Sequence, residues 1–224
     1  MGKTTQLHYE NLAKMYNLVK RTYSGNKELA VLFPEDGKAE HSNGYTYNID
    51  SHELVLGTDN TSVNIQLKYN SLANRYDNIC VFHNHMNATL FSPRDIATFF
   101  KLEKLTCLVA DSGESLVLLH KTKETYEHAK QYADKNGKNA INNIIAIEVP
   151  KIHKKASDYI RQNAQNFSDL CNTLQDSNSL NDNELFEKYV NCQKQVSSFI
   201  STQFEKKFAI NYFTVPKENL LDIY

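Results

Sequence analysis

Hydrophobic positions recur at helical spacing near the start of the chain and at tighter spacing in the short apolar runs that follow. Residues 5–23 are expected to form a helix, because their apolar positions fall on one helical face. Those positions are Leu12, Met15, Tyr16 and Val19. The continuous apolar runs predict buried strands, and they lie at residues 28–33, 79–83, 105–110 and 115–120. Weaker strand signals lie near residues 44–49 and 53–56.

Two further segments complete the first half of the chain. Residues 62–69 alternate apolar and polar positions, which predicts a half-buried strand. Residues 93–104 look helical, and the short "DSGE" between the last two apolar runs predicts paired strands joined by a tight turn.

Helical spacing dominates from Lys123 onward. One apolar stripe contains Tyr159, Ala164, Phe167, Leu170, Cys171 and Leu174. A second contains Leu185, Tyr189, Cys192, Val196, Phe199, Ile200, Phe204 and Phe208. The polar residues 175–184 separate the stripes, so we expect an antiparallel helix pair. The fold class predicted is α/β, with one domain over residues 1–122 and a helical extension over residues 123–224.

Composition narrows the classes of function. The chain has 224 residues, of which 41% are hydrophobic, enough to bury a core. Its net charge of -1 does not indicate a nucleic-acid partner. The chain shows no apolar leader and no run long enough to span a membrane, so a cytoplasmic protein is expected. Its cysteines form no C-x-x-C pair and are expected to be buried free thiols: Cys80, Cys107, Cys171 and Cys192.

The candidate chemistry lies in "ICVFHNHMNATLFSPRDIATFF", residues 79–100. Residues two apart on a strand face the same side, so His83 and His85 can aim two imidazoles at one point. Asp95 can supply a third ligand if the intervening loop folds back. Two histidines and a carboxylate suit a catalytic zinc ion with one open position, where the pKa of a bound water falls to about 7.

A purely structural interpretation of the same residues stays open. Ser92 is a natural N-cap, Pro93 suits the first helical position, and Asp95 stands where a carboxylate completes a capping box. Asn84 should point to the opposite face of the strand from the two histidines, where a structural hydrogen bond is expected.

The joint pattern, His83-x-His85 followed after six residues by Ser92-x-x-Asp95, resembles the JAMM/MPN-type zinc metalloproteases and the related RadC-like proteins. The resemblance covers about residues 25–122 and implies an MPN-like (cytidine-deaminase-like) mixed sheet flanked by helices. Met86 stands where the family usually has proline, and the loop before Ser92 is one residue shorter than in eukaryotic members. The short loop looks like that of phage and mobile-element proteins.

The resemblance also implies roles for the residues. His83, His85 and Asp95 would hold Zn2+, Ser92 would stabilise an oxyanion, and an upstream glutamate would act on the metal-bound water. Glu28 matches the position of that glutamate, at the start of an early strand after a helix. Alternatives for this base remain: Glu35, Glu40 and Glu53. The remaining candidates, His41 and His52, lie in polar segments and are expected to be solvated.

Two functions follow from these patterns. The first is a hydrolase, a zinc metallopeptidase or isopeptidase that cleaves a peptide or isopeptide bond in a protein or peptide substrate. The alternative is a non-catalytic binding or assembly protein on the same fold, phage-associated or RadC-like and near DNA. In either case the C-terminal helices are expected to border the metal groove, or to contact a partner protein or a second copy of the chain.

Overall fold

The computed structural model describes residues 9–22, 28–35, 47–57, 63–84, 91–112, 115–137, 140–162, 195–196 and 198–221. The helices of these ranges are α1 (Tyr9–Thr22), α2 (Gln66–Ala73), α3 (Pro93–Lys101), α4 (Lys123–Asn136), α5 (Ala140–Gln162) and α8 (Glu218–Leu221), and residues 198–208 are also helical. The strands are β1 (Leu29–Pro34), β2 (Glu53–Leu56), β3 (Ile79–Asn84), β4 (Leu105–Ser112), β5 (Ser115–Lys121) and β6 (Ile210–Pro216). Among the described residues, no helix combines the length and the apolar character that crossing a membrane requires.

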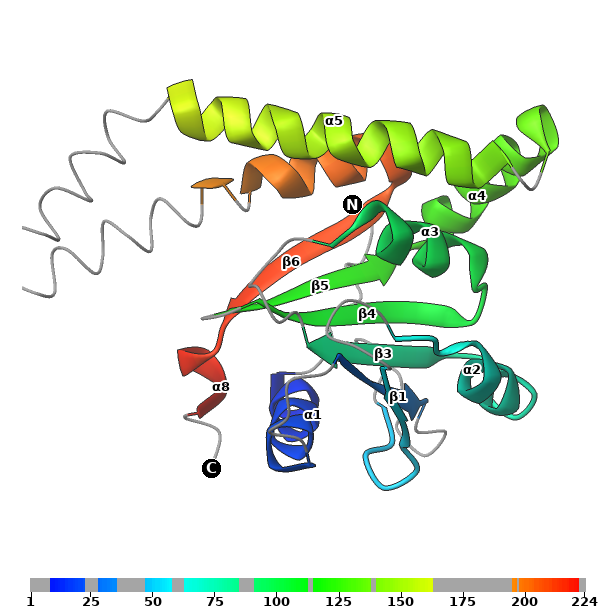
Figure 1. The fold of residues 1–224 in the computed structure, drawn as a ribbon, viewed down its shortest axis with the longest axis vertical. Coiled ribbons are helices and arrows are strands. Elements are labelled where there is room, and N and C mark those ends of the chain that lie inside the picture. Colours follow the sequence, from blue (N-terminus) through cyan, green and yellow to red (C-terminus); the bar gives the residue numbers. More distant parts are fainter. Residues whose placement is uncertain are drawn as a thin grey trace, which may run out of the picture.

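The strands form one mixed sheet in the order β2-β1-β3-β4-β5-β6 (Figure 1). β3 and β4 run parallel, and the other neighbouring pairs are antiparallel. Helix α3 provides the crossover between the two parallel strands. In open α/β sheets, ligands bind beyond the carboxyl ends of such strands. The end of β3 and the start of α3 are therefore the first place to look for a site.

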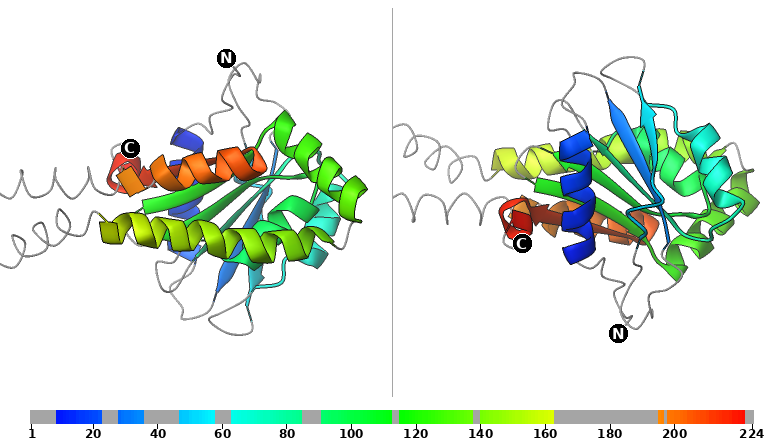
Figure 2. Two further views of the ribbon diagram at one scale, coloured as in Figure 1. Left: turned by 90° about the horizontal axis from the view of Figure 1, so that it is seen from above. Right: turned by 90° about the horizontal axis from the view of Figure 1, so that it is seen from below.

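Helices cover both faces of the sheet (Figure 2). We call these the α5 face and the α1 face. The core of the α5 face includes Val81 of β3, Ile96 and Phe99 of α3, Val149 of α5, and Phe204. The core of the α1 face includes Met15 of α1, Val31 of β1, Phe82 of β3, Val109 of β4, and Leu220 of α8. Neighbouring strand residues such as Val81 and Phe82 thus serve opposite cores, as the alternation of side chains in a strand requires.

Most of the predicted elements are confirmed. The first helix, the strands at residues 28–33, 53–56 and 79–83, the helix after Ser92, and the antiparallel pair β4 and β5 all lie where the patterns placed them. Cys80 and Cys107 are buried free thiols as expected, whereas the other two cysteines lie outside the described residues. Near residues 44–49, the described part contains only a single bridge between Tyr47 and Glu35.

The half-buried strand predicted at residues 62–69 is wrong. The chain forms helix α2 from Gln66, and Leu67, which the alternation placed in the core, is 85% exposed. The buried positions are Ile65, Tyr69 and Leu72, at helical spacing. The hydroxyl of Tyr69 also accepts a hydrogen bond from the backbone N–H of Lys104, at 3.0 Å. The alternation of apolar and polar positions therefore does not describe the chain beyond Ile65, where the helix begins.

Strand β6 was missed, so the extension over residues 123–224 is not purely helical. The helical residues 198–208 end at Ala209, which has a φ of 53°, a left-handed conformation unusual for alanine. The hydroxyls of Thr122 and Thr125 both donate to the Ala209 carbonyl, at 3.1 and 2.6 Å. β6 then pairs along the whole of β5 and becomes the edge of the sheet. This part of the chain therefore belongs to the same sheet as β1 to β5.

In the described part of the C-terminal region, α5 and the helical residues 198–208 run antiparallel. Glu148 of α5 pairs with Lys207 at 3.0 Å, and Tyr159 of α5 stacks on Phe199 with ring centroids 4.8 Å apart. The later residue of α5 contacts the earlier residue of the other helix, so the two helices run in opposite directions. They lie side by side over the sheet (Figure 2). The parts of the two stripes within residues 163–194 lie outside the described residues.

Candidate metal and catalytic site

His83 lies at the carboxyl end of β3, on the α5 face. It is opposite Ala30 in the antiparallel β1–β3 register, and both it and Val81 point to the same side of the sheet. The imidazole is only 5% exposed. A histidine at this end of a buried strand is positioned by the sheet itself, which favours precise placement of a ligand. His85, the second predicted ligand, lies outside the described residues.

Ser92 and Asp95 form the capping box that the sequence suggested. Ser92 Oγ accepts from the Asp95 backbone N–H at 3.2 Å, and Asp95 Oδ2 accepts from the Ser92 backbone N–H at 2.8 Å. Ser92 Oγ also donates to Asp95 Oδ2, at 2.7 Å. Pro93 occupies the first helical position. The cap is therefore confirmed. A carboxylate has about four lone-pair sites, so a capping role and a metal contact are compatible on one residue.

Phe91 brings the start of α3 to His83. Its ring lies 5.8 Å from the imidazole, centroid to centroid, and the side chain is 1% exposed. Phe91 immediately precedes the N-cap and shares the α5-face core with Ile96, the arrangement of a hydrophobic staple. Sequence reasoning overlooked this residue, although an apolar residue just before an N-cap serine is the usual signal. Through Phe91, the Ser92–Asp95 box is anchored beside the histidine strand.

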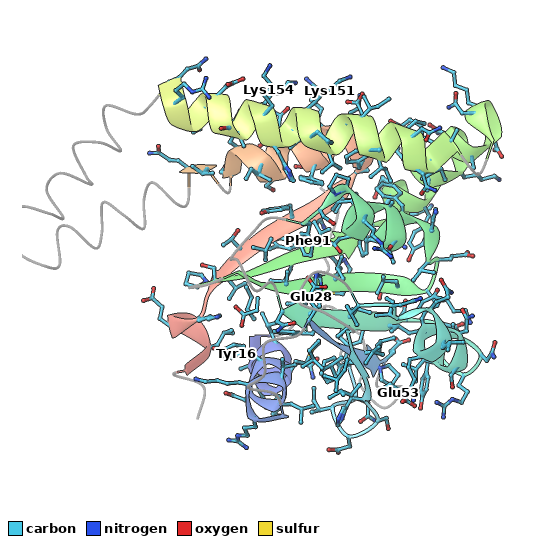
Figure 3. The ribbon with its side chains drawn as sticks, viewed as in Figure 1. Tyr16, Glu28, Glu53, Phe91, Lys151 and Lys154 are labelled. Carbon is cyan, nitrogen blue, oxygen red and sulfur yellow. The ribbon has the colours of Figure 1, made fainter. Side chains whose placement is uncertain are left out.

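Glu28 lies at the start of β1, next to the end of β3. Its carbonyl oxygen accepts from the Gly57 backbone N–H at 2.8 Å, which continues the β1–β2 register by one residue. Side chains two residues apart on a strand share a face, so Glu28 lies on the same face as Ala30, and hence as His83. In Figure 3, Glu28 and Phe91 both lie between the layers of α1 and α5.

The alternative glutamates in the described chain lie elsewhere. Glu35 follows the opposite end of β1, where its carboxylate accepts from Asn78 Nδ2 at 2.6 Å. Glu53 is in β2 and forms an ion pair with Lys68 at 2.8 Å. Glu40 is outside the described residues. Among the described candidates for the base, Glu28 is thus the one that adjoins the His83 end of the sheet.

His52, the other candidate histidine within the described ranges, makes its contacts elsewhere. Nδ1 of His52 lies 2.8 Å from the Ile49 carbonyl oxygen, and the ring is 6.1 Å from that of Phe33. His41 lies outside the described residues. Within the ranges that the structure describes, no three histidine, cysteine or acidic side chains are grouped closely enough to hold a metal ion. The predicted trio includes His85, which those ranges leave out.

The buried thiols are not nucleophile candidates. Cys80 and Cys107 are neighbours on the parallel strands β3 and β4, on the α1 face. Burial raises the pKa of Cys80 well above its ordinary value, and the hydrogen bond with Cys107 raises it further. The thiolate is the reactive form of cysteine, so a raised pKa leaves Cys80 inert.

Asn84 forms the structural hydrogen bond expected of it. It follows His83 in β3 and points to the α1 face, and its Oδ1 accepts from the Leu29 backbone N–H at 2.6 Å.

Comparisons with protein-family models, with curated proteins and with solved structures found no match. What this chain does must therefore be inferred from its own residues.

Proposed function

We propose that the chain is a zinc-dependent hydrolase of the JAMM type, cleaving a peptide or isopeptide bond on an MPN-like fold. The observation that carries the proposal is the meeting of three sequence signals at one end of the α5 face. His83 lies near the carboxyl end of β3, Glu28 directly precedes the adjacent β1 on the same face, and Phe91 packs the start of the Ser92–Asp95 box against His83. These signals are up to 67 residues apart in the chain, from Glu28 to Asp95.

The donor set fits zinc. His83 would contribute an imidazole and Asp95 a carboxylate, and His85 follows His83 by two residues in sequence, the spacing that would put both imidazoles on one face of a continuing strand. Bound there, zinc would act as a Lewis acid and lower the pKa of a coordinated water towards about 7. The buried, apolar side of the site, which Phe91 supplies, strengthens electrostatic interactions by excluding water.

The proposed roles of the other residues follow from their positions. Glu28 would accept a proton from the attacking water and return it to the leaving amine. Ser92 would donate its hydroxyl hydrogen to the oxyanion. That hydrogen is directed at Asp95 Oδ2 in this structure, so the hydroxyl must rotate when substrate binds. Rotation about the Cβ–Oγ bond redirects the hydrogen and leaves the capping bond from the Asp95 N–H to Ser92 Oγ in place.

Metal analysis and one isosteric substitution test the proposal. Protein purified without added metal should contain one zinc per chain, and the His83→Ala, His85→Ala double variant should contain none. Glu28→Gln should keep its zinc and lose hydrolysis by about a hundredfold or more, because the amide cannot shuttle a proton. Peptide libraries and isopeptide-linked protein conjugates are the substrates to assay.

Glu53→Gln is the matched control, because Glu53 is a strand glutamate on the same sheet with an ion pair of its own. It should lose neither zinc nor turnover. Zinc content that is unchanged in the double variant would refute the metal site. Loss of zinc in Glu28→Gln would make Glu28 a ligand instead of a base.

A second candidate function rests on the capping box. Ser92 and Asp95 satisfy each other's hydrogen bonds, which gives them a structural role without any chemistry. The chain would then be a binding or assembly protein on the same fold. Zinc-free protein that retains its folded structure and binds a partner would favour this alternative.

A further inference from the structure

The peptide unit that joins Glu28 to Leu29 is held from both sides. Its carbonyl oxygen accepts from the Gly57 N–H at 2.8 Å, towards β2. Its N–H donates to Asn84 Oδ1 at 2.6 Å, towards β3. A peptide unit is planar, so holding its two polar ends fixes its plane and the position of the Glu28 Cα, the atom from which the side chain leaves the backbone.

The bond from Asn84 takes over where the β1–β3 ladder stops. Paired residues run from Pro34 and Ile79 to Ala30 and His83. The next pair in this register would be Leu29 and Asn84. At that point the acceptor for the Leu29 N–H is the side-chain oxygen of Asn84. The side chain thereby holds the end of β1 against β3 one residue beyond the last regular pair.

Position 84 holds a polar asparagine where the pattern of β3 would place an apolar residue. Its side chain is on the α1 face, where the preceding inward residues of β3 are the buried Cys80 and Phe82. Continuing that pattern would call for an apolar residue. A short amide costs apolar burial but supplies an acceptor that reaches the neighbouring backbone. Asn84 directly follows His83 in sequence. Its hydrogen bond to the Leu29 N–H therefore fixes the start of β1 relative to His83.

We propose that Asn84 is a positioning residue that holds Glu28 in register with His83 for proton transfer. This inference rests on the proposed function. Asn84 itself points away from the reacting atoms and acts through the Glu28–Leu29 peptide. General-base catalysis depends on the distance between the carboxylate and the proton it takes, so loosening that peptide should lower kcat more than it changes substrate binding.

Asn84→Leu tests the proposal, because leucine has a similar shape and no acceptor. We expect the Leu29 amide to exchange its hydrogen about tenfold faster or more, as the N–H loses its partner. Zinc content and KM should stay within about twofold of wild type, and kcat should fall about tenfold or more. Asn84→Asp retains the acceptor oxygen and should restore the protection of the Leu29 amide and most of kcat. If the leucine variant does not fold, Asn84→Ser gives the same test, because its hydroxyl is too short to reach the N–H.

Asn11→Ala is the matched control. Asn11 also joins two backbone segments through its amide, with bonds of 3.0 Å to both the N–H and the carbonyl of Tyr47, on the α1 face and away from Glu28. It should lower stability and leave kcat unchanged below its melting temperature. If kcat falls in Asn11→Ala as much as in Asn84→Leu, the positioning role of Asn84 is overturned. Unchanged exchange at Leu29 in Asn84→Leu would overturn it as well.

These failures can be told apart from failure of the proposed function. A wild-type protein without zinc or hydrolysis would overturn the function and this inference together. An active, zinc-loaded wild type whose Asn84→Leu variant retains full kcat would overturn only the role of Asn84.

Discussion

At the scale of single residues, Lys121 is the unexpected charge in the core. It ends β5 and is 5% exposed. Nζ donates to the Leu102 carbonyl oxygen at 2.8 Å and lies 4.9 Å from the ring centre of Phe99 and 5.4 Å from that of Tyr126. Burial lowers the pKa of Lys121 to about 7, against a smaller opposing effect of Glu103. The carbonyl and the two rings only partly replace the lost hydration.

This burial predicts a rise in stability with pH. In the unfolded chain the pKa of Lys121 is near its ordinary value, so between about pH 7 and pH 10 the unfolded state binds more protons than the folded state. The free energy of unfolding should therefore increase over that range, by an amount on the order of a few kcal/mol. Below pH 7 both states carry the proton, and this contribution no longer changes. Urea unfolding at pH 7 and pH 9.5 measures the difference.

Lys121→Met should flatten that dependence, because methionine does not titrate. Lys68→Met is the control, since Lys68 is a half-exposed lysine whose ion pair is on the surface. It should preserve the rise. Equal pH dependence in wild type and Lys121→Met would contradict the assignment to Lys121.

At the scale of elements, helix α3 shows how one segment can serve structure and chemistry together. Its capping box is complete, its last apolar residues are buried, and its start is packed on His83 through Phe91. A helix secured at both ends gives a fixed platform for any side chain in its first turn. The cap and the proposed oxyanion donor share a single hydroxyl, that of Ser92, so one substitution cannot separate them.

Two substitutions at Ser92 separate the cap from the chemistry. Ser92→Ala removes both and should lower the free energy of unfolding by about 0.5–2 kcal/mol and reduce kcat. Ser92→Gly also removes the hydroxyl, but glycine at an N-cap costs only about a few tenths of a kcal/mol, so stability should largely recover while kcat stays low. Urea unfolding and turnover are measured on both variants. Turnover at the wild-type level in both would leave Ser92 with its cap alone.

The elements also show where sequence patterns suffice. The runs at β1, β3, β4 and β5 are continuous and apolar because both faces of the central strands are buried, so the signal is strong. Residues 62–69 misled because Val63 and Ile65 precede α2 in an irregular segment, and four alternating positions mimic a strand. The buried Leu72, one turn beyond Tyr69, was the evidence for a helix.

The site follows the same division. The His83 strand, the cap at Ser92 and the hydrogen bond of Asn84 were all predictable from local spacing. The contact of Phe91 with His83 was not, because it joins the far side of a loop to a strand through packing. The nearness of Glu28 to His83 came from the family resemblance, and local spacing alone would not have found it. It depends on β1 pairing with β3, a tertiary fact.

At the scale of the whole molecule, the C-terminal strand β6 forms one edge of the sheet. β6 follows a helix that ends at Phe208. The sequence has no glycine or proline at that end, where the left-handed residue is Ala209, so the sequence pattern did not show that a strand begins there. The run "INYFTVP" after it is rich in β-branched and aromatic residues, which was the available signal. Lys217, just beyond β6, pairs with Asp111 of β4 at 2.5 Å and lies over the ring of Tyr16 in α1, 5.3 Å from its centre. The C-terminal segment is thus joined to the first helix and to the middle of the sheet.

This architecture predicts that the C-terminal part cannot be removed. A chain ending near residue 150 would lack β6, the helical residues 198–208 and half of α5. It would expose the β5 edge along its whole length, together with the α5-face core that Phe204 and Phe208 complete. We expect such a chain to aggregate or to remain unfolded, as measured by circular dichroism and sedimentation.

A matched internal deletion isolates the cause of that failure. Replacing residues 166–192 by a short glycine-serine linker leaves α5, residues 198–208 and β6 intact. The stacking of Tyr159 on Phe199 and the ion pair of Glu148 with Lys207 already hold together the two helices that the linker joins. The shortened chain should fold, sediment as a compact particle and keep its zinc, because the residues retained include the whole described sheet and both of its helical layers. A folded, zinc-loaded chain ending at residue 150 would refute this account and would make the first 150 residues an independent domain. An unfolded internal deletion would show instead that residues 166–192 are needed to hold the two C-terminal helices together.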